Sequence, residues 1–415
     1  MAWKICNDIA IGKFYARYSN KIYWRVQMTK RKVLIFNRYF LPGYKAGGPP
    51  RTLANMISLL SNEFDFYLVT LDRDLGDENS YPDIEIGSWI QRDKYRVIYL
   101  PRKEITYSKL KNLIRGISPD VVYLNSLWDM LFTIRILFLR RLGILPRAKF
   151  VLAIRGQLSD GAMSIRARQK QLLLKLFKIF AVLRGLVIQI SSEKERVDFE
   201  KQLGADFIKR TNINIMVAEN ISMSSGTLIE GQPFPSETTG RLNLSLLGRV
   251  APIKNIDFAI ETLKYVRTPV DLEITGLCED QNYWQICQDL VQTLPDHVTV
   301  NFSGPVSPAM IPDMLNQKDL FFSPTKGENY GHAIAEALGV GLPVLISDQT
   351  PWIELDKIGV GWDLPIDDPK IFAEKIDAFS KIEPAERRQI KLRCLEYATE
   401  KLNNKKIVDN NRRLF

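Results

Sequence analysis

The chain has 415 residues, of which 46% are hydrophobic and 25% charged, and its formal net charge at pH 7 is +10. The length predicts two to three domains, and the positive charge predicts an anionic partner, which is a nucleotide phosphate, an acidic membrane surface or a nucleic acid. The sequence has no apolar run long enough for a transmembrane helix. It also has no helix-turn-helix, zinc or RNP-type element, which argues against a nucleic-acid-binding protein.

Cysteines and histidines exclude several kinds of active site. The four cysteines are scattered without the spacing of a metal site, as expected for reduced thiols in a cytoplasmic protein. The two histidines, His297 and His332, are too few for a His-based metal site or a Ser-His-Asp triad. We therefore expect no metal in the site.

The first 27 residues mix charged residues with isolated aromatic residues and lack the apolar core of a secretory signal. Met28 stands directly before the first strong strand pattern and is a candidate start of translation. We expect residues 1–27 to form a disordered N-terminal extension.

The first half of the chain alternates buried strands with helical segments, which predicts a parallel, doubly wound sheet. After the first strand, Val33–Asn37, comes the loop Gly47-Gly48-Pro-Pro-Arg51 and then a helix to about Leu60. Adjacent glycines before a helix allow the backbone to approach a ligand, so this loop is either a phosphate or acceptor pocket or an ordinary turn. The later strands are expected at Phe66–Leu71, Arg96–Leu100, Val121–Asn125, Phe150–Arg155 and Leu186–Ser191.

A basic and strongly apolar helix is predicted over Met163–Arg184. Such a helix either lies on an anionic membrane surface or packs on the sheet with a solvated basic edge. The similar segment Leu131–Arg141 favours membrane contact.

Residues 224–240 are rich in Ser, Thr, Gly and Pro, which is typical of a linker. A second alternating series of strands and helices follows. We place the first domain at 28–225, the linker at 226–240, the second domain at 241–395 and a helical tail at 396–415. The strands of the second domain are expected at Leu242–Leu247, Leu272–Thr275, Val298–Phe302, Leu320–Ser323 and Val344–Ile346.

The loop after the first strand of the second domain carries Gly248, Arg249 and Lys254. A glycine turn with two cations at a strand end suits a diphosphate, which needs positive donors and a close backbone. The alternative is that both cations are surface charges. Glycines at positions 276 and 304 also follow strand ends on the same edge of the sheet.

Two glutamates lie near the start of the helix that follows Leu320–Ser323. Glu328 stands in the loop, and Glu336 follows in a helix that we expect to begin near Tyr330. A carboxylate accepts two hydroxyl hydrogen bonds, so the pair suits a polyhydroxyl ligand. The alternative is that both are solvated acids that complement the helix dipole.

These motifs, taken in order, resemble the donor-binding domain of the family-4 retaining glycosyltransferases of the GT-B fold. The resemblance covers nearly all of the second half. It implies a GT-B architecture, in which two doubly wound, Rossmann-like domains face an interdomain cleft, with an acceptor-binding domain first and a donor-binding domain second. It is carried by Gly248-Arg249 with Lys254-Asn255, by Ile274-Thr-Gly276, by Phe302-Ser-Gly304-Pro-Val306, by Ser323–Gly331 and by Glu336–Pro343.

The family's roles, transferred to matching positions, imply a site for a nucleotide-diphospho-sugar. Arg249 and Lys254 would hold the diphosphate, Glu336 would accept the ribose hydroxyls, and Glu328 would contact the donor sugar. Arg249, Lys254 and Glu328 are thus the implied catalytic residues. Further donor contacts are implied for Gly48, Gly248, Asn329, Tyr330 and Gly331.

The first half resembles the family more loosely, through Gly47–Arg51, Arg155–Ser159 and Ile215–Asn220. Arg155 would point into the cleft. Many relatives have a histidine near the transferred sugar where this chain has Asn125, which can still donate a hydrogen bond. Asn125 and Arg155 are therefore the implied contacts to the sugar or the acceptor.

The resemblance implies a metal-independent hexosyltransferase that needs no cofactor beyond its nucleotide-sugar. It further implies a lipid-linked or saccharide acceptor, a role in bacterial surface polysaccharide biosynthesis, and a cytoplasmic protein at the inner face of the cell membrane. Two other functions stay open: a catalytically impaired partner that binds the nucleotide-sugar, and a GT-B-type nucleotide-sugar epimerase.

Overall fold

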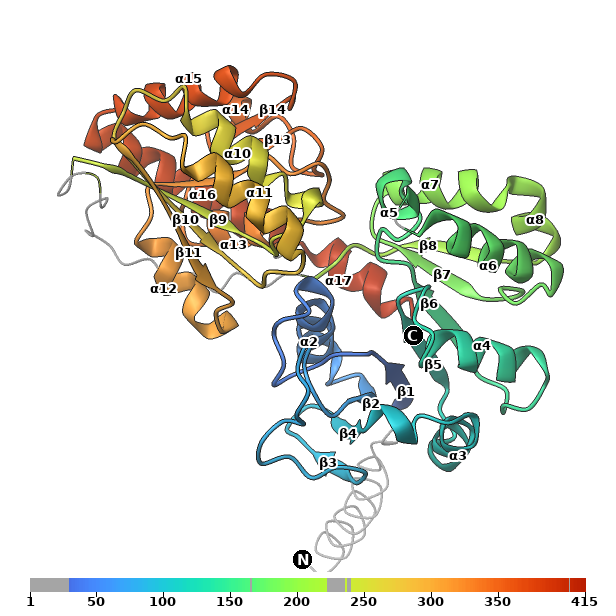
Figure 1. Ribbon diagram of the computed structural model, residues 1–415. Coiled ribbons are helices and arrows are strands. Elements are labelled where there is room, and N and C mark those ends of the chain that lie inside the picture. The colour runs from blue at the N-terminus through green and yellow to red at the C-terminus, as the bar shows by residue number, and fades with distance from the viewer. Residues whose placement is uncertain (1–29, 165, 222–235, 237–239, 403) are drawn as a thin grey trace, which may run out of the picture.

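The structure is a computed structural model that describes residues 30–164, 166–221, 236, 240–402 and 404–415. The expected N-terminal extension 1–27 and most of the expected linker, 226–235 and 237–239, lie outside the described residues. Two α/β lobes, each built on one sheet, lie side by side, and a C-terminal helix runs between them (Figure 1).

The first sheet has the strand order β3-β4-β2-β1-β5-β6-β7-β8. All neighbours are parallel except β3, which runs antiparallel to β4 at the edge. The central strands are continuous apolar runs because helices cover both faces of the sheet. The strands are β1 (Arg31–Phe36), β2 (Phe64–Leu71), β3 (Trp89–Gln91), β4 (Arg96–Leu100), β5 (Val121–Asn125), β6 (Lys149–Ala153), β7 (Val187–Ile190) and β8 (Asn214–Val217).

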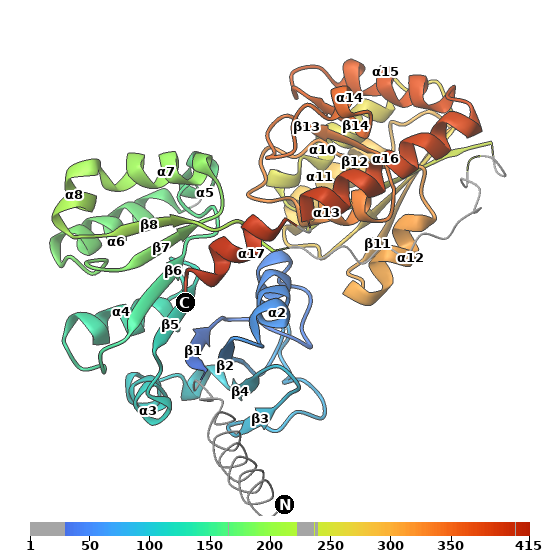
Figure 2. The same cartoon turned by 180° about the vertical axis from the view of Figure 1, so that it is seen from behind.

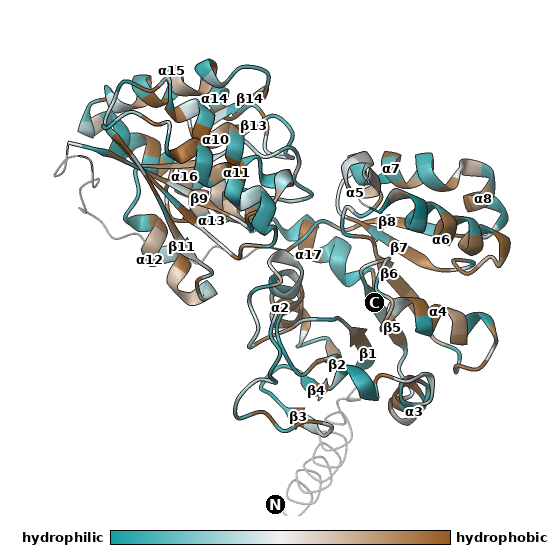
Figure 3. Ribbon diagram, in the orientation of Figure 1, coloured by the Kyte–Doolittle hydropathy of each residue, from teal (hydrophilic) through white to brown (hydrophobic). Residues whose placement is uncertain are grey.

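The helices of the first lobe pack on this sheet by their apolar faces, which leaves their polar faces outside (Figure 3). The predicted helix Met163–Arg184 is wrong in its bounds, because Arg166 adopts a left-handed conformation (φ 54°) that separates two helices. The helices are α2 (Gly48–Leu60), η1 (Arg102–Glu104), α3 (Tyr107–Ile117), α4 (Thr133–Arg141), α5 (Asp160–Ser164), α6 (Ala167–Ile179), α7 (Glu193–Leu203) and α8 (Ala205–Arg210).

The second sheet is fully parallel, with the order β11-β10-β9-β12-β13-β14. Its strands are β9 (Leu242–Leu247), β10 (Val270–Thr275), β11 (Val298–Gly304), β12 (Leu320–Ser323), β13 (Val344–Ser347) and β14 (Gly361–Leu364). Its helices are η2 (Pro252–Lys254), α10 (Ile256–Leu263), α11 (Gln281–Val291), η3 (Pro308–Met310), α12 (Ile311–Asn316), α13 (His332–Gly339), α14 (Leu355–Ile358), α15 (Pro369–Ser380) and α16 (Pro384–Leu402). The last helix of the chain, α17 (Lys405–Arg412), packs on the first lobe.

The end of the chain joins the two lobes. Helix α16 packs on the second lobe, and α17 returns toward the first lobe (Figure 2). There the Phe415 ring lies 5.3 Å from that of Phe64 and 5.8 Å from that of Tyr123, between ring centroids. Residues 396–415 are therefore the last turns of α16 followed by a helix that helps to close the core of the first lobe.

Each sheet has one point at which the strand order reverses. In the first sheet it lies between β1 and β5, and in the second between β9 and β12. The loops at the carboxyl ends of these strands diverge to opposite sides, which leaves a crevice where doubly wound folds bind their ligands. Among the described residues, no helix is both long and apolar enough to cross a membrane.

Candidate active site

A cleft of ≈ 710 Å³ lies between the two lobes, and both strand-order reversals open into it. Its volume is within the usual range for sites that bind small ligands. Every residue that the sequence predicted for the site lines this cleft: Gly48, Asn125, Arg155, Gly248, Arg249, Lys254, Glu328, Asn329, Tyr330, Gly331 and Glu336.

Two cations of the second lobe are each paired with a carboxylate. The Nη1 atom of Arg249 lies 2.6 Å from Oε2 of Glu279, and about two fifths of each side chain is exposed. Lys254 Nζ forms an ion pair with Glu328 Oε1 in a more buried setting, with side-chain exposures of 18% and 17%. The loops after β9 and β12 are thus joined by a charge pair across the second strand-order reversal.

Glycines allow the loops behind these cations to touch. A Cβ atom at Gly276 would lie 2.0 Å from the carbonyl oxygen of Gly248, so no larger residue fits without moving the backbone. The amide of Gly276 also donates to the carbonyl of Gly304 at 2.9 Å. The backbone segments at the carboxyl ends of β9, β10 and β11 are therefore in direct contact with one another next to Arg249.

Helix α13 begins at His332, later than the predicted start near Tyr330. The reason is Gly331, which caps the helix in a left-handed conformation (φ 80°). Trp352 Nε1 donates to the Tyr330 carbonyl at 2.6 Å and fixes the loop before the helix. Glu328 and Glu336 therefore do not share one helical path, and they have different partners.

The start of α13 meets the start of α2 across the cleft. Arg51 Nη1 forms an ion pair with Glu336 Oε1, with side-chain exposures of 27% and 15%. Thr52 Oγ1 lies 2.9 Å from His332 Nε2. A Cβ atom at Gly48 would lie 2.6 Å from Cδ2 of His332, so glycine is what lets the imidazole pack against α2. We call this contact the α2–α13 seam.

Burial and charge change two pKa values at the seam. Burial raises the pKa of Glu336 to about 7, although the charge of Arg51 opposes the change. Burial also lowers the pKa of His332 to about 3, and the nearby cations Arg51, Arg155 and Lys254 lower it further. The imidazole is therefore neutral at physiological pH, and it lies among three positive charges that together favour an anionic ligand.

The first lobe contributes a hydrogen-bonded network centred on Asn125. Its Nδ2 donates to Asn37 Oδ1 at 2.7 Å, and its Oδ1 accepts from Arg155 Nε at 2.7 Å. Arg155 also donates to the Tyr123 hydroxyl at 2.9 Å and to Asn220 Oδ1. Asn125 is 2% exposed. Both ends of the Asn125 side chain thus have partners in the first lobe, and its oxygen helps to hold Arg155 at the cleft wall.

The cleft residues that were not identified as site residues from the sequence include the charged residues Arg38, Arg51 and Asp129. Arg38 follows the end of β1, and Asp129 follows the end of β5 by four positions. A polar residue shortly after a buried strand is the signal that could have indicated both. Arg51 gave no comparable signal, because its partner Glu336 belongs to the other lobe.

The sequence and the fold were compared with known proteins. Residues 234–393 match the family model described as Glycosyl transferases group 1. No curated protein matches the chain. Similar solved structures include sucrose-phosphate synthase from Thermosynechococcus elongatus, with 16% identity over 93% of this chain and 98% of that chain and a TM-score of 0.67.

Two further structures extend the likeness. Anabaena Alr3699/HepE in complex with UDP and glucose has 16% identity over 92% of this chain and 98% of that chain, with a TM-score of 0.66. WaaG, a glycosyltransferase involved in lipopolysaccharide biosynthesis, has 16% identity over 89% of this chain and 96% of that chain, with a TM-score of 0.61. These matches confirm the predicted GT-B fold.

Proposed function

We propose that this chain is a retaining group 1 glycosyltransferase that takes its sugar from a nucleotide-sugar, and that its donor is UDP-glucose, bound in the cleft between the two lobes. The observation that carries the proposal is the set of charged side chains at the second strand-order reversal, where Arg249, Lys254 and Glu328 face the first lobe. The choice of donor is supported by Alr3699/HepE, whose structures hold UDP and UDP-glucose.

The donor diphosphate binds to Arg249 and Lys254. In the structure these cations are paired with Glu279 and Glu328. A diphosphate offers more negative charge and more acceptor oxygens than a carboxylate, so it replaces both acids as the partner. Glu328 is then released from Lys254 and accepts a hydroxyl of the donor sugar.

The ribose binds to Glu336. Arg51 engages only Oε1 of this carboxylate in the ion pair, so the second oxygen can accept the ribose hydroxyls. The backbone of Asn329, Tyr330 and Gly331, next to the start of α13, faces the sugar or the diphosphate, where the helix dipole favours negative charge.

Transfer breaks the bond between the anomeric carbon and the diphosphate oxygen, and forms a bond from that carbon to the acceptor oxygen on the same face. Arg249 and Lys254 stabilise the charge that develops on the departing diphosphate, and one of its oxygens takes the acceptor proton. One such contact contributes about 3 kcal/mol to the transition state. The two cations do the work of a metal ion, so the reaction needs none.

The acceptor is a lipid-linked or free saccharide at the inner face of the bacterial cell membrane. Helix α6 buries Leu174 and Phe177 against the lobe. Two other apolar residues of this helix face the solvent: Leu172 is 60% exposed, and Ile179, at the end of the helix, is 73% exposed. Arg168, Lys175 and Lys178 of the same helix are also exposed, and a helix with exposed apolar and basic residues suits an anionic membrane surface. A role in surface polysaccharide assembly is supported by WaaG, which is involved in lipopolysaccharide biosynthesis.

The first test is calorimetric titration with UDP, GDP, ADP and their glucose conjugates, followed by assay of sugar transfer or donor hydrolysis. We expect UDP-glucose to bind, Lys254→Ala to lower turnover about a hundredfold, and a chelator of divalent ions to leave turnover unchanged. Lys264→Ala is the matched control, because Lys264 pairs with Glu261 outside the cleft. Failure of every nucleotide to bind would refute the proposal.

Membrane contact is tested by sedimentation with vesicles of phosphatidylcholine alone or mixed with phosphatidylglycerol. Binding is expected only with the anionic vesicles, and Ile179→Ser should weaken it. Val197→Ser is the control, since Val197 is 62% exposed on α7. Equal sedimentation of both variants with the wild type would contradict this part of the proposal.

A further inference from the structure

The strand-order reversal of the first sheet lies between β1 and β5 and opens into the same cleft as the donor wall. The donor residues occupy the corresponding reversal of the second sheet. By the rule that ligands bind at this point of a doubly wound sheet, the first reversal is also a binding position. The residues that stand there are Arg38, after β1, and Asp129, after β5.

Arg38 and Asp129 form an ion pair that leaves one donor and one acceptor unused. Arg38 Nη2 lies 2.6 Å from Asp129 Oδ1, which also accepts from the Leu131 amide at 2.9 Å. The Arg38 Nε atom and the Asp129 Oδ2 atom are buried and have no hydrogen-bond partner among the described residues. Arginine–carboxylate pairs frequently close as a two-bond fork, and that geometry would satisfy both atoms.

The two unused atoms have complementary chemistry. Arg38 Nε–H is a donor, Asp129 Oδ2 is an acceptor, and a sugar hydroxyl both donates and accepts. Asp129 is 3% exposed and held by its loop, whereas the Arg38 side chain is 37% exposed. Arg38 is thus the partner that can turn to admit a hydroxyl group.

The surroundings are those of a carbohydrate site. Tyr39 and Trp128 line the cleft beside the ion pair and offer apolar ring surface next to polar groups. Trp128 is held in place, because its Nε1 donates to the Gln157 carbonyl at 3.1 Å and its ring stacks on Phe177. Since Asp129 balances the charge of Arg38, the pair favours a neutral ligand over a phosphate or a carboxylate.

We propose that Arg38 and Asp129 form the acceptor subsite of this enzyme and bind hydroxyl groups of a neutral saccharide. The inference rests on the proposed function, because it takes the opposite wall of the cleft as the donor site. On this proposal the part of the acceptor that enters the cleft is a neutral sugar ring, and the carrier attached to that ring lies outside the Arg38–Asp129 subsite.

The test uses methyl α-glucoside, methyl α-galactoside, methyl α-mannoside and methyl α-glucuronide as probes, with binding followed by saturation-transfer NMR with and without UDP. We expect at least one neutral glycoside to bind the wild type. Asp129→Asn and Arg38→Lys should each weaken that binding by about tenfold or more, because a hydrogen bond to a charged group contributes at least that much.

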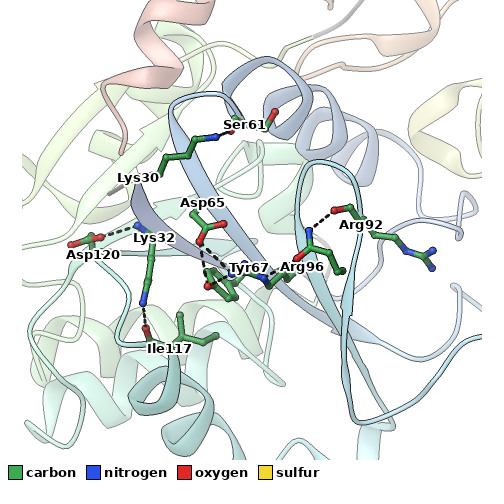
Figure 4. A network of polar contacts seen from close by, with 10 residues as sticks. Lys30, Lys32, Ser61, Asp65, Tyr67, Arg92, Arg96, Ile117 and Asp120 are labelled. Atoms are coloured by element: carbon green, nitrogen blue, oxygen red, sulfur yellow. Dashed lines mark hydrogen bonds and ion pairs between the residues drawn. The ribbon is translucent and has the colours of Figure 1, made fainter. Parts of the chain in front are cut away.

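Asp65→Asn is the matched control. Asp65 pairs with Arg96 at 3.3 Å in the same lobe, at the amino ends of β2 and β4 and outside the cleft (Figure 4). This variant should bind the glycoside as the wild type does. The affinity for UDP should be unchanged in all three variants, and this result would also show that the variants are folded. If Asp129→Asn does not fold, Arg38→Lys still tests the subsite, because Arg38 is the more exposed of the two residues.

Three results would overturn the subsite: no neutral glycoside binds, only the glucuronide binds, or both cleft variants bind the glycoside as tightly as the wild type. Absence of UDP binding is a separate result. It would contradict the proposed function. The NMR measurement of glycoside binding without UDP would still show whether Arg38 and Asp129 form a saccharide subsite.

Discussion

Replacing Arg51 by glutamine should raise the pH range over which UDP-glucose binding strengthens, because it should raise the pKa of Glu336. Arg51 is the cation that pairs with Glu336 at the α2–α13 seam. The pKa of Glu336 is about 7 even with Arg51 present, because burial of the carboxylate outweighs the attraction. Without Arg51 the ionised form of Glu336 loses its partner, and protonation becomes easier.

The magnitude follows from the exposure of the pair. Breaking a buried ion pair costs about 3–5 kcal/mol, and an exposed pair contributes about 1 kcal/mol or less. With side-chain exposures of 27% and 15%, the seam pair lies between these limits, at about 1.4 kcal/mol. The ionised fraction of Glu336 at pH 7 then falls from about one half to about one tenth, which weakens UDP-glucose binding about fivefold.

Calorimetric titration with UDP-glucose at several pH values measures this effect. The affinity of Arg51→Gln should fall below that of the wild type at pH 7 and approach it at pH 9, where Glu336 is ionised in both proteins. Glu336→Gln should bind weakly without this pH dependence, and adding Arg51→Gln to it should change nothing further. Arg96→Gln, which breaks the Arg96–Asp65 pair, is the matched control.

Tighter binding by Arg51→Gln at pH 7 would refute the reasoning. That result would mean that Arg51 competes with the ribose for Glu336 and does not hold the carboxylate ionised. An unchanged affinity at every pH would remove Glu336 from the nucleotide site.

Three other substitutions test the site. Arg249→Ala should lower the turnover of UDP-glucose about a hundredfold, since one contact to the departing diphosphate contributes about 3 kcal/mol, and wild-type turnover would contradict its role. Glu328→Ala should keep its affinity for UDP but lose turnover; full turnover would disprove the sugar contact. For His332, the folded pKa of about 3 lies below the ordinary 6.5, so the unfolded chain binds the proton first. The free energy of unfolding should therefore fall by about 2 kcal/mol from pH 7 to pH 5, and His332→Asn should lack this part of the decrease in denaturant titrations.

Much of the fold could be predicted from local sequence. The strands Arg96–Leu100, Val121–Asn125, Leu242–Leu247 and Leu320–Ser323 were predicted with the bounds that the structure shows. Strands that are buried on both faces are short apolar runs, and the adjacent Gly and Pro residues mark their ends. Because parallel strands end on one edge of a sheet, these ends also indicated that Arg249, Lys254 and Glu328 lie close together.

Tertiary structure alone determined the partners of these residues. Arg51 and Glu336 are 285 positions apart in the chain, and nothing in either local pattern indicates the other. The same is true of Gly48 and His332, whose contact depends on how α2 meets α13. The sequence by itself thus determined the two sheets and the charged loops at their edges, because burial and turn chemistry are local. The seam, the Asn125 network and the Arg38–Asp129 pair were decided only by packing, which brings distant segments of the chain into contact.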